Sequence, residues 1–220
     1  MSLRVRAGEV IGLAGLEGSG LRIMMEACSG LQRIHKGKLT ICGQDMTNQP
    51  YHSFLDRGVA FVPASRLEEG MVGGLTIREH CALADEAAGV FVDWHKAQSQ
   101  ASEKIREFNI IGQPGTKIEE LSGGNQQRAI LALLPDTLRL LLMEHPTRGL
   151  DVESGRWVWS KLSQRKKQGT AIVFTSTDLS ELIEYGDRII VFSGGVMSKP
   201  MPSSKVSVEE LGYLIGGKDT

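Results

Sequence analysis

The sequence has no long hydrophobic run, few cysteines and no excess of charge of either sign. Apolar stretches such as LLLM at 140–143 are far shorter than the ~20 residues that a helix needs to cross a bilayer, so any role at a membrane is expected to depend on a partner protein. The net charge of −1 gives no sign of the basic face of a nucleic-acid-binding protein, and no nucleic-acid partner is expected. The three scattered cysteines, Cys28, Cys42 and Cys81, form neither a metal-ligand spacing nor a disulfide framework, which favours a cytoplasmic location.

The overall composition is typical of a single globular domain. The chain has 220 residues, of which 41% are hydrophobic and 23% are charged, enough for one sizeable core. A predicted strand runs into a glycine-rich loop close to the first residue, and we therefore expect these residues to be part of a longer polypeptide. The four histidines His35, His52, His80 and His95 show no metal-ligand spacing and are expected at the surface.

Short apolar runs alternate with helical patterns along most of the chain. The runs predicted to be strands are VIGLAG (10–15), KLTICG (38–43, an edge strand), GVAFVP (58–63), LRLLLM (138–143), AIVFTS (171–176) and DRIIVFSGG (187–195). Helices are expected over residues 21–29 and 153–169. This alternation predicts an α/β fold with a parallel sheet. The mostly helical block 76–134 interrupts it and is predicted to be an inserted subdomain.

The stretch GLEGSGLR at 15–22 lies between a predicted strand and a predicted helix, which is the context of a phosphate-binding loop. The backbone N–H groups of such a loop and the start of the following helix favour an anion. The G-x-x-x-x-G spacing alone says little in a chain with 26 glycines. A loop of the type G-x-x-x-x-G-K-[ST] also needs a lysine for the β- and γ-phosphates and a hydroxyl for Mg²⁺. Leu21 and Arg22 stand in those two places.

A second glycine-rich motif, LSGGNQQR at 121–128, is more specific. Ser122 is predicted to cap the helix that follows, and Gly123 and Gly124 allow a ligand to approach the backbone closely. The alternative is an ordinary glycine turn before a helix.

The stretch LRLLLMEHPTRGLD at 138–151 disfavours that alternative. Its predicted strand ends in an acid, Glu144, and the turn that follows ends at Asp151. An acid at the tip of a strand beside a phosphate-binding loop is where such proteins hold Mg²⁺. The two glycine-rich motifs and this acid together indicate a nucleotide site.

In their order along the chain, the glycine loop, LSGGNQQ, the strand with its acid, PTRGLD and the final strand–TSTD–helix segment resemble the motifs of an ATP-binding-cassette (ABC) ATPase. The resemblance covers nearly the whole chain. It is closest to the sugar and nucleoside importer ATPases that carry two cassettes in one polypeptide. FVPASRLEEG at 61–70 resembles the VPEDR..EG segment of that subfamily, and PTRGLD together with LSGGNQQ is typical of its second, C-terminal cassette.

This resemblance implies a P-loop NTPase fold of three parts. We expect a RecA-like core with a parallel sheet over residues 1–75 and 136–220, a small antiparallel β part within it, and a helical subdomain over 76–135. Residues 1–220 would then form one ABC ATPase domain, a fragment of a two-cassette chain.

Carried over residue by residue, the resemblance divides the family's functional positions into two groups. The loop keeps its shape at Gly15, Gly18, Ser19 and Gly20, but the groups that would act on the chain's own nucleotide are altered: Leu21 replaces the loop lysine, Arg22 the Mg²⁺-binding hydroxyl residue, Ala64 the Q-loop residue, Glu144 the Mg²⁺-organising aspartate, His145 the catalytic glutamate and Thr177 the switch histidine. The signature motif and the D-loop match instead, at Ser122, Gly123, Gly124 and Gln126 and at Gly149, Leu150 and Asp151.

Cassettes of this family work as head-to-tail pairs, with each ATP held between one phosphate loop and the signature motif of the other cassette. The resemblance therefore implies a cassette of a sugar or nucleoside importer that donates its signature motif to a partner's ATP site. Its own site is expected to hold ATP and Mg²⁺ weakly or not at all, with Glu144 as the candidate metal ligand, and the isolated chain to hydrolyse little or no ATP.

The partners that the resemblance implies are an N-terminal cassette in the same polypeptide, membrane-spanning permease subunits and, indirectly, a periplasmic or lipoprotein solute-binding protein. They would place the chain peripherally on the cytoplasmic face of the cell membrane. Two other functions stay open. One is an active ATPase that uses Glu144 and His145 in its own site, with His145 as general base. The other is a non-catalytic nucleotide-sensing or scaffold module unrelated to transport. The signature motif and the VPASR segment favour transport over both.

Overall fold

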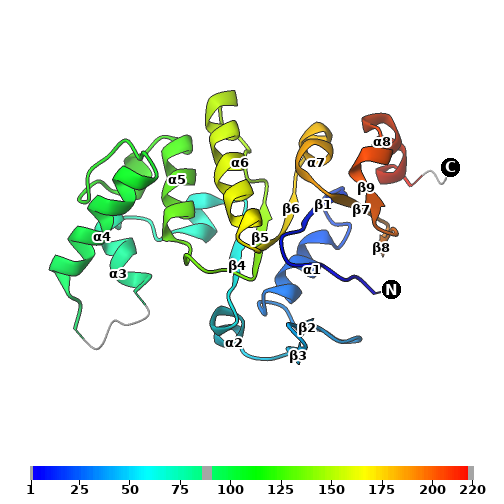
Figure 1. Ribbon diagram of the computed structural model, residues 1–220, viewed down its shortest axis with the longest axis horizontal. Helices are drawn as coiled ribbons and strands as arrows, with labels where there is room; N and C mark the ends of the chain where they lie inside the picture. The colour runs from blue at the N-terminus through cyan, green and yellow to red at the C-terminus, as the bar shows by residue number, and fades with distance from the viewer. Residues whose placement is uncertain (1, 86–90, 218–220) are drawn as a thin grey trace. The chain divides into compact units, whose positions relative to one another are not determined.

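The computed structural model describes residues 2–85 and 91–217 of the chain. They form two compact units, each assembled from separated stretches of sequence (Figure 1). Unit 1 comprises Met1–Phe61, Asp136–Pro146 and Trp159–Thr220, and unit 2 comprises Val62–Pro135 and Thr147–Val158.

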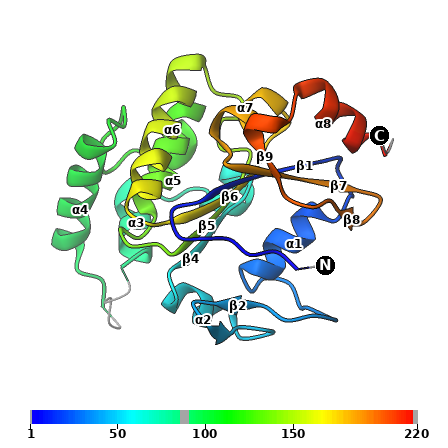
Figure 2. The same cartoon turned by 45° about the vertical axis from the view of Figure 1, so that its right-hand side comes forward.

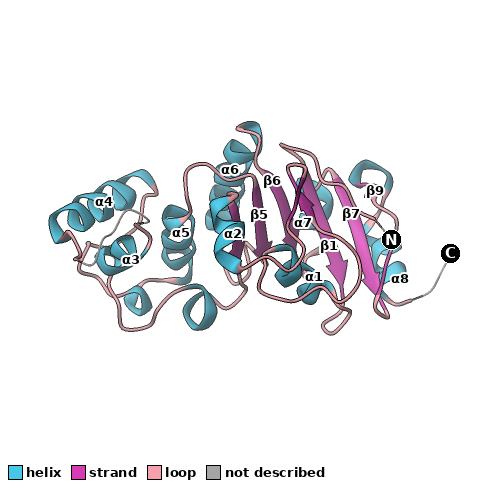
Figure 3. Cartoon of the chain, turned by 90° about the horizontal axis from the view of Figure 1, so that it is seen from below, coloured by secondary structure: helices cyan, strands magenta, loops and turns pink. Residues whose placement is uncertain are grey.

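Within the described residues, the main sheet has seven strands, in the order β4-β5-β6-β1-β7-β8, with β9 also paired to β7. Its strands are β1 (Val10–Gly15), β4 (Val59–Val62), β5 (Leu140–Glu144), β6 (Ala171–Thr175), β7 (Arg188–Ser193), β8 (Val196–Met197) and β9 (Met201–Pro202). Strands β5, β6, β1 and β7 are parallel and lie side by side in Figure 3. The predicted α/β fold with a mostly parallel sheet is confirmed.

A separate two-stranded antiparallel sheet is formed by β2 (Thr40–Ile41) and β3 (Gln44–Asp45). It confirms the small antiparallel part. The edge strand predicted over 38–43 is therefore reduced to two residues, because the chain turns back on itself within that stretch: Cys42 and Gly43 both have positive φ, of 49° and 81°.

The helices of unit 1 are α1 (Leu21–Cys28), α2 (Tyr51–Asp56), α7 (Leu179–Tyr185), the 3-10 turn η3 (Ser203–Lys205) and α8 (Val208–Ile215). The second half of α6 (Val152–Lys167) also belongs to this unit. Ile11 and Leu13 of β1 are buried in the core with Met25 of α1. Gly12 lies between them and faces the other side of the sheet. There α7 packs so closely that a Cβ atom on Gly12 would lie 3.1 Å from Cδ2 of Leu182. Figure 1 shows α7 above β1 and α1 below it, and Figure 2 shows α8 next to α7.

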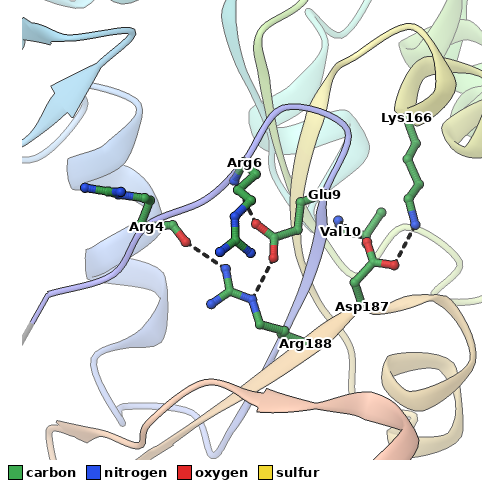
Figure 4. Close-up of polar contacts among 7 residues, drawn as sticks. All are labelled: Arg4, Arg6, Glu9, Val10, Lys166, Asp187 and Arg188. Atoms are coloured by element: carbon green, nitrogen blue, oxygen red, sulfur yellow. Dashed lines mark hydrogen bonds and ion pairs between the residues drawn. The ribbon is translucent and has the colours of Figure 1, made fainter.

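A network of ion pairs fastens the segment before β1 to β7 (Figure 4). Glu9 accepts hydrogen bonds from Nε of Arg188 at 2.6 Å and from the backbone N–H of Arg6 at 2.7 Å. Asp187, which precedes β7, pairs with Nζ of Lys166 on α6 at 2.7 Å. The side chains thus join β1, β7 and α6 beyond the backbone pairing of the sheet.

Unit 2 is helical in its regular structure. Its elements are the π-helix η1 (Arg66–Gly70), α3 (Ile77–Leu83), α4 (Trp94–Glu107), the 3-10 turn η2 (Ile118–Glu120), α5 (Gly123–Leu133) and the first half of α6. Helices α3, α4 and α5 pack against one another (Figure 1). The described part of the block 76–134 is mostly helical, as predicted, and residues 86–90 of that block lie outside the described residues. None of the helices within 2–85 and 91–217 has the length and hydropathy of a membrane span.

One expectation about unit 2 is wrong. His35, His52 and His95 are exposed as predicted, but His80 is only 5% exposed. It lies on the inner face of α3, where its Nε2 accepts the backbone N–H of Val72 at 3.0 Å and its Nδ1 lies 2.9 Å from the carbonyl oxygen of Thr76, to which it donates. These two backbone partners satisfy the buried ring and hold the loop before α3.

Candidate functional site

The carboxyl ends of three parallel strands meet at one edge of the sheet in unit 1. Thr175 at the end of β6 is paired in register with Leu13 of β1 and with Glu144 of β5. The glycine loop after β1, the acid that ends β5 and the segment after β6 are therefore brought to the same edge, as the sequence predicts. This edge is where open α/β sheets bind their ligands.

The glycine loop keeps two features that suit an anion. Gly18 and Gly20 adopt left-handed backbone conformations, with φ of 80° and 93°, and Gly20 has no side chain to cap α1. No described side chain caps the start of α1, and such a helix N-terminus favours an anion. Ser19 is only 7% exposed, and its Oγ has no hydrogen-bond partner among the described residues. That hydroxyl turns back into the loop, 2.8 Å from where a Cβ atom on Gly15 would lie.

The two positions after the loop do not suit Mg²⁺. Leu21 packs against the hydrophobic core and carries no charged or polar group. Arg22 donates from Nε to Oε1 of Glu26 at 2.8 Å, and its Nη1 lies 3.7 Å from Oε2 of Glu144. Glu144 is buried, and the guanidinium of Arg22 lies beside its carboxylate. A divalent cation would need that carboxylate as a ligand, and the guanidinium stands in its way. The residues present therefore fit a phosphate group but not a bound Mg²⁺.

His145 and Thr177, which replace the catalytic glutamate and the switch histidine in the resemblance, follow β5 and β6. The backbone of His145 is left-handed, with φ of 48°, an uncommon conformation for a residue other than glycine. Its backbone N–H donates to the carbonyl oxygen of Thr175 at 3.0 Å. Thr177 is exposed. Ala64 belongs to unit 2.

The signature motif lies in unit 2 at the start of α5. Ser122 is the N-cap, as predicted: its Oγ accepts from the backbone N–H of Asn125 at 3.4 Å and from Nδ2 of Asn125 at 2.9 Å. Ser122 is exposed, and because its oxygen only accepts in these contacts, its own O–H remains available to an outside acceptor. Gln126 behaves differently: it is buried, and its Nε2 donates to the carbonyl oxygen of Leu121 at 3.0 Å. Gln126 therefore supports the motif from inside.

The D-loop lies against this motif. Asp151 accepts from the backbone N–H and from Oγ of Ser154, at 2.9 and 2.8 Å. These bonds hold the pKa of the Asp151 carboxyl below its usual range. Ser154 also touches the glycine pair, since a Cβ atom on Gly124 would lie 3.0 Å from its Oγ.

Signature motif and D-loop line one pocket of about 640 Å³, which we call the signature pocket. Its lining residues are Asn109, Ile111, Ser122, Gly123, Gly124, Asn125, Arg128, Gly149, Leu150, Asp151, Glu153 and Ser154. The guanidinium of Arg128 lies over the ring of Trp157, 4.0 Å from its centroid, and donates to the carbonyl oxygen of Phe108 at 3.2 Å. Sequence reasoning missed Arg128 and Ser154. Arg128 stands inside LSGGNQQR and could have been found there, whereas nothing in the pattern marks Ser154.

Comparisons with known proteins identify the family of the chain. The model of the family described as ABC transporter matches residues 1–148. The chain is 34% identical to the nucleoside import ATP-binding protein NupA of Lactococcus lactis subsp. cremoris, over 99% of this chain and 44% of that protein. It is 33% identical to the arabinose import ATP-binding protein AraG of Burkholderia pseudomallei, over 94% of this chain and 43% of that protein. The chain thus spans less than half the length of these curated relatives.

The fold also has close counterparts among solved structures. The dimeric structure of the bacterial ABC transporter cassette MJ0796 matches with a TM-score of 0.77 and 21% identity, over 91% of this chain and 88% of that one. At this identity the likeness shows the fold alone.

Proposed function

Because the chain belongs to the ABC transporter family, we propose that it is the second cassette of a sugar or nucleoside importer and that it supplies its signature motif to the ATP of a partner cassette. The relatives are named as ATP-binding proteins for the import of a nucleoside and of a sugar, arabinose. Their length, more than twice the matched stretch, leaves room for a second cassette in the same polypeptide.

The observation that carries this proposal is the opposite state of the two candidate sites. In unit 1, Leu21 is part of the core packing and Arg22 is committed to Glu26 and Glu144. In unit 2, Ser122 caps its helix and still presents an O–H in an open pocket. A chain built in this way is a poor catalyst on its own nucleotide and a competent donor to another.

The glycine loop has a reduced role in this proposal. Its uncapped helix start and the buried Ser19 hydroxyl favour a phosphate group, while the Arg22–Glu144 pair opposes Mg²⁺. The loop then binds a nucleotide weakly and without a metal requirement. Hydrolysis needs both a positioned water and the charge of Mg²⁺, so the chain's own site is expected not to turn over.

The remaining parts of the proposal concern the assembly. The partners are an N-terminal cassette, permease subunits and, through them, a solute-binding protein. The chain would lie at the cytoplasmic face of the membrane. The division into a core of 1–75 and 136–220 and a helical subdomain of 76–135 is proposed together with them.

Ser122→Arg in the assembled transporter tests the proposal. A long cation at this position fills the signature pocket and removes the hydroxyl, and ATP hydrolysis and solute uptake are expected to fall ~100-fold or more, the cost of losing a preorganised transition-state contact. Leu21→Lys serves as the matched variant in the other site and is expected to change transport little. Unchanged ATPase activity in Ser122→Arg would sink the proposal, and so would a collapse of activity in Leu21→Lys with Ser122→Arg intact.

A further inference from the structure

The arginine of the FVPASRLEEG segment lies inside unit 2, directly beside the signature motif. Nε of Arg66 donates to Oε1 of Gln127 at 2.6 Å. Its Nη2 donates to the carbonyl oxygen of Arg148, immediately before Gly149 of the D-loop. Its Nη1 lies 3.5 Å from where a Cβ atom on Gly123 would be placed. A single guanidinium thus meets α5, the glycine pair and the D-loop.

Consecutive glycines of the signature motif each face a different anchor. Gly123 faces Arg66, and Gly124 faces Ser154, whose hydroxyl bonds Asp151. A Cβ atom at Gly124 would press on Ser154, whereas a Cβ atom at Gly123 would meet the guanidinium of Arg66 at ordinary van der Waals distance. The glycine pair is therefore held between η1 and the start of α6, with the D-loop as the element that both anchors share.

The chemistry of the contact calls for arginine. The guanidinium is a rigid planar fork that donates in several fixed directions, whereas a lysine ammonium is a single point charge on a flexible stem. Gln127 is 2% exposed and accepts the Nε bond inside the unit, where water does not replace it. The bonds of a charged donor to partners of this kind are the stronger ones in proteins.

We propose that Arg66 is a positioning residue that fixes the signature motif to the D-loop, so that Ser122 and Asp151 move as one body when the chain meets the partner's nucleotide. This inference rests on the proposed function for its purpose, because it concerns the segments that would reach the partner's ATP. The residue does not touch the nucleotide. It acts through Gln127, Gly123 and the carbonyl of Arg148.

Amide hydrogen exchange on the chain itself tests the coupling. Two backbone N–H groups are suitable reporters. The N–H of Gln126 donates to the carbonyl oxygen of Ser122 at 2.8 Å, and the N–H of Leu150 donates to the carbonyl oxygen of Thr147 at 3.1 Å. In Arg66→Ala both are expected to exchange about tenfold faster or more, the effect of losing at least one charged hydrogen bond. Arg66→Lys is expected to behave in the same direction. Arg106→Ala, an exposed arginine on α4, is the control and leaves both unchanged.

Amides of β6 in unit 1 report on general unfolding. If amide exchange in β6 is also faster in Arg66→Ala, that variant is partly unfolded, and the test then uses the exchange rates of Arg66→Lys alone. Unchanged exchange at either reporter, or a rise at one reporter only, overturns the proposal, because the two segments would then not be coupled through Arg66. Full recovery of protection by lysine overturns it as well, since charge alone would suffice.

Kinetics of the assembled transporter separate this inference from the proposed function. Arg66→Ala is expected to lower kcat for ATP hydrolysis about tenfold with KM for ATP nearly unchanged, because the partner's loop still loads the nucleotide. A rise in KM at constant kcat counts against positioning. The result for Ser122→Arg decides the proposed function independently, and the exchange data decide the Arg66 coupling whichever way Ser122→Arg turns out.

Discussion

The strand ends of unit 1 and the signature pocket of unit 2 differ in what their polar groups are bonded to. At the strand ends, the buried Glu144 has a guanidinium of its own chain beside it, and the position of the loop lysine is filled by a core leucine. At the signature pocket, internal bonds shape the backbone but leave the Ser122 O–H and the glycine edges facing the pocket. Internal pairing can thus occupy the polar groups at one candidate site of a chain while the polar groups at another candidate site stay exposed.

The largest effect is expected from crowding the signature pocket. A Cβ atom on Gly124 already lies 3.0 Å from Oγ of Ser154, so Gly124→Val pushes the motif away from the D-loop. A displacement of about 1 Å in a catalytic constellation costs about 100-fold in rate. The ATPase rate of the assembled transporter is expected to fall by that order.

Gly115→Val is the matched control, since a Cβ atom on Gly115 meets nothing within 4 Å among the described residues of unit 2. Equal losses in both variants would mean that any bulky residue in unit 2 lowers the measured rate. The comparison between the two regions would then lose its basis.

The second effect concerns the strand ends. Leu21→Lys with Arg22→Thr restores the phosphate ligand and the hydroxyl, and it removes the cation beside Glu144. Each charged contact added is worth one to two powers of ten in affinity, so ATP binding by calorimetry is expected to tighten about 10- to 100-fold, with a larger gain in Mg²⁺ than in a chelator.

The unaltered chain provides the reference for this experiment. Its ATP affinity, where measurable, is expected to be the same in Mg²⁺ and in a chelator. Arg22→Thr alone is the intermediate step, which removes the guanidinium beside Glu144 without adding the lysine. An unaltered chain whose affinity already depends on Mg²⁺ would contradict the reading of the Arg22–Glu144 pair.

A third, smaller effect tests a part of unit 2 that sequence reasoning placed wrongly. His80→Ala leaves the backbone N–H of Val72 without its acceptor and opens space beside α3, and it is expected to lower the free energy of unfolding by about 1–3 kcal/mol. Denaturant unfolding measures this. His95→Ala, at an exposed position of α4, should change it by less than about 0.5 kcal/mol. Similar values for the two variants would show that the buried histidine bonds contribute nothing.

The sequence predicted the elements whose pattern is local and strong. Strands β1, β4, β5, β6 and β7 lie where apolar runs predicted strands. Helices α1 and α6 lie where helical patterns next to glycines predicted helices. Helix α8 and the short strands β8 and β9 were not predicted, and two-residue strands have no periodicity by which a sequence could reveal them. His80 was missed because its burial follows from packing around α3, which a single histidine in a helical pattern does not reveal.

For the site, motif positions were predictable and side-chain partnerships were not. The cap at Ser122 and the acid at Glu144 follow from local chemistry. The Arg22–Glu144 contact joins residues 122 positions apart in sequence, and the Arg66–Gln127 bond joins residues 61 apart. Only the fold brings them together, and both bear directly on whether a site keeps or loses its chemistry.

The smallest effect compares acidic groups of the two units. Burial raises the pKa of Glu9, but the hydrogen bonds and charges of Arg188 and Arg6 outweigh it and hold that pKa below its usual value (Figure 4). A carboxyl with a lowered folded-state pKa stabilises the protein above its unfolded pKa of about 4.3, and this contribution is lost as the pH falls through the folded value. Glu9→Gln is therefore expected to flatten the acid limb of the melting temperature below about pH 4.5 and to lower stability at neutral pH.

Asp151→Asn removes a carboxyl whose pKa is also lowered, but solvent screens its exposed bonds to Ser154, so its acid limb should change less. Glu184→Gln, exposed on α7, is the control. A larger change for Asp151→Asn than for Glu9→Gln would place the acid-sensitive contacts in unit 2 and reverse this ordering of the two regions.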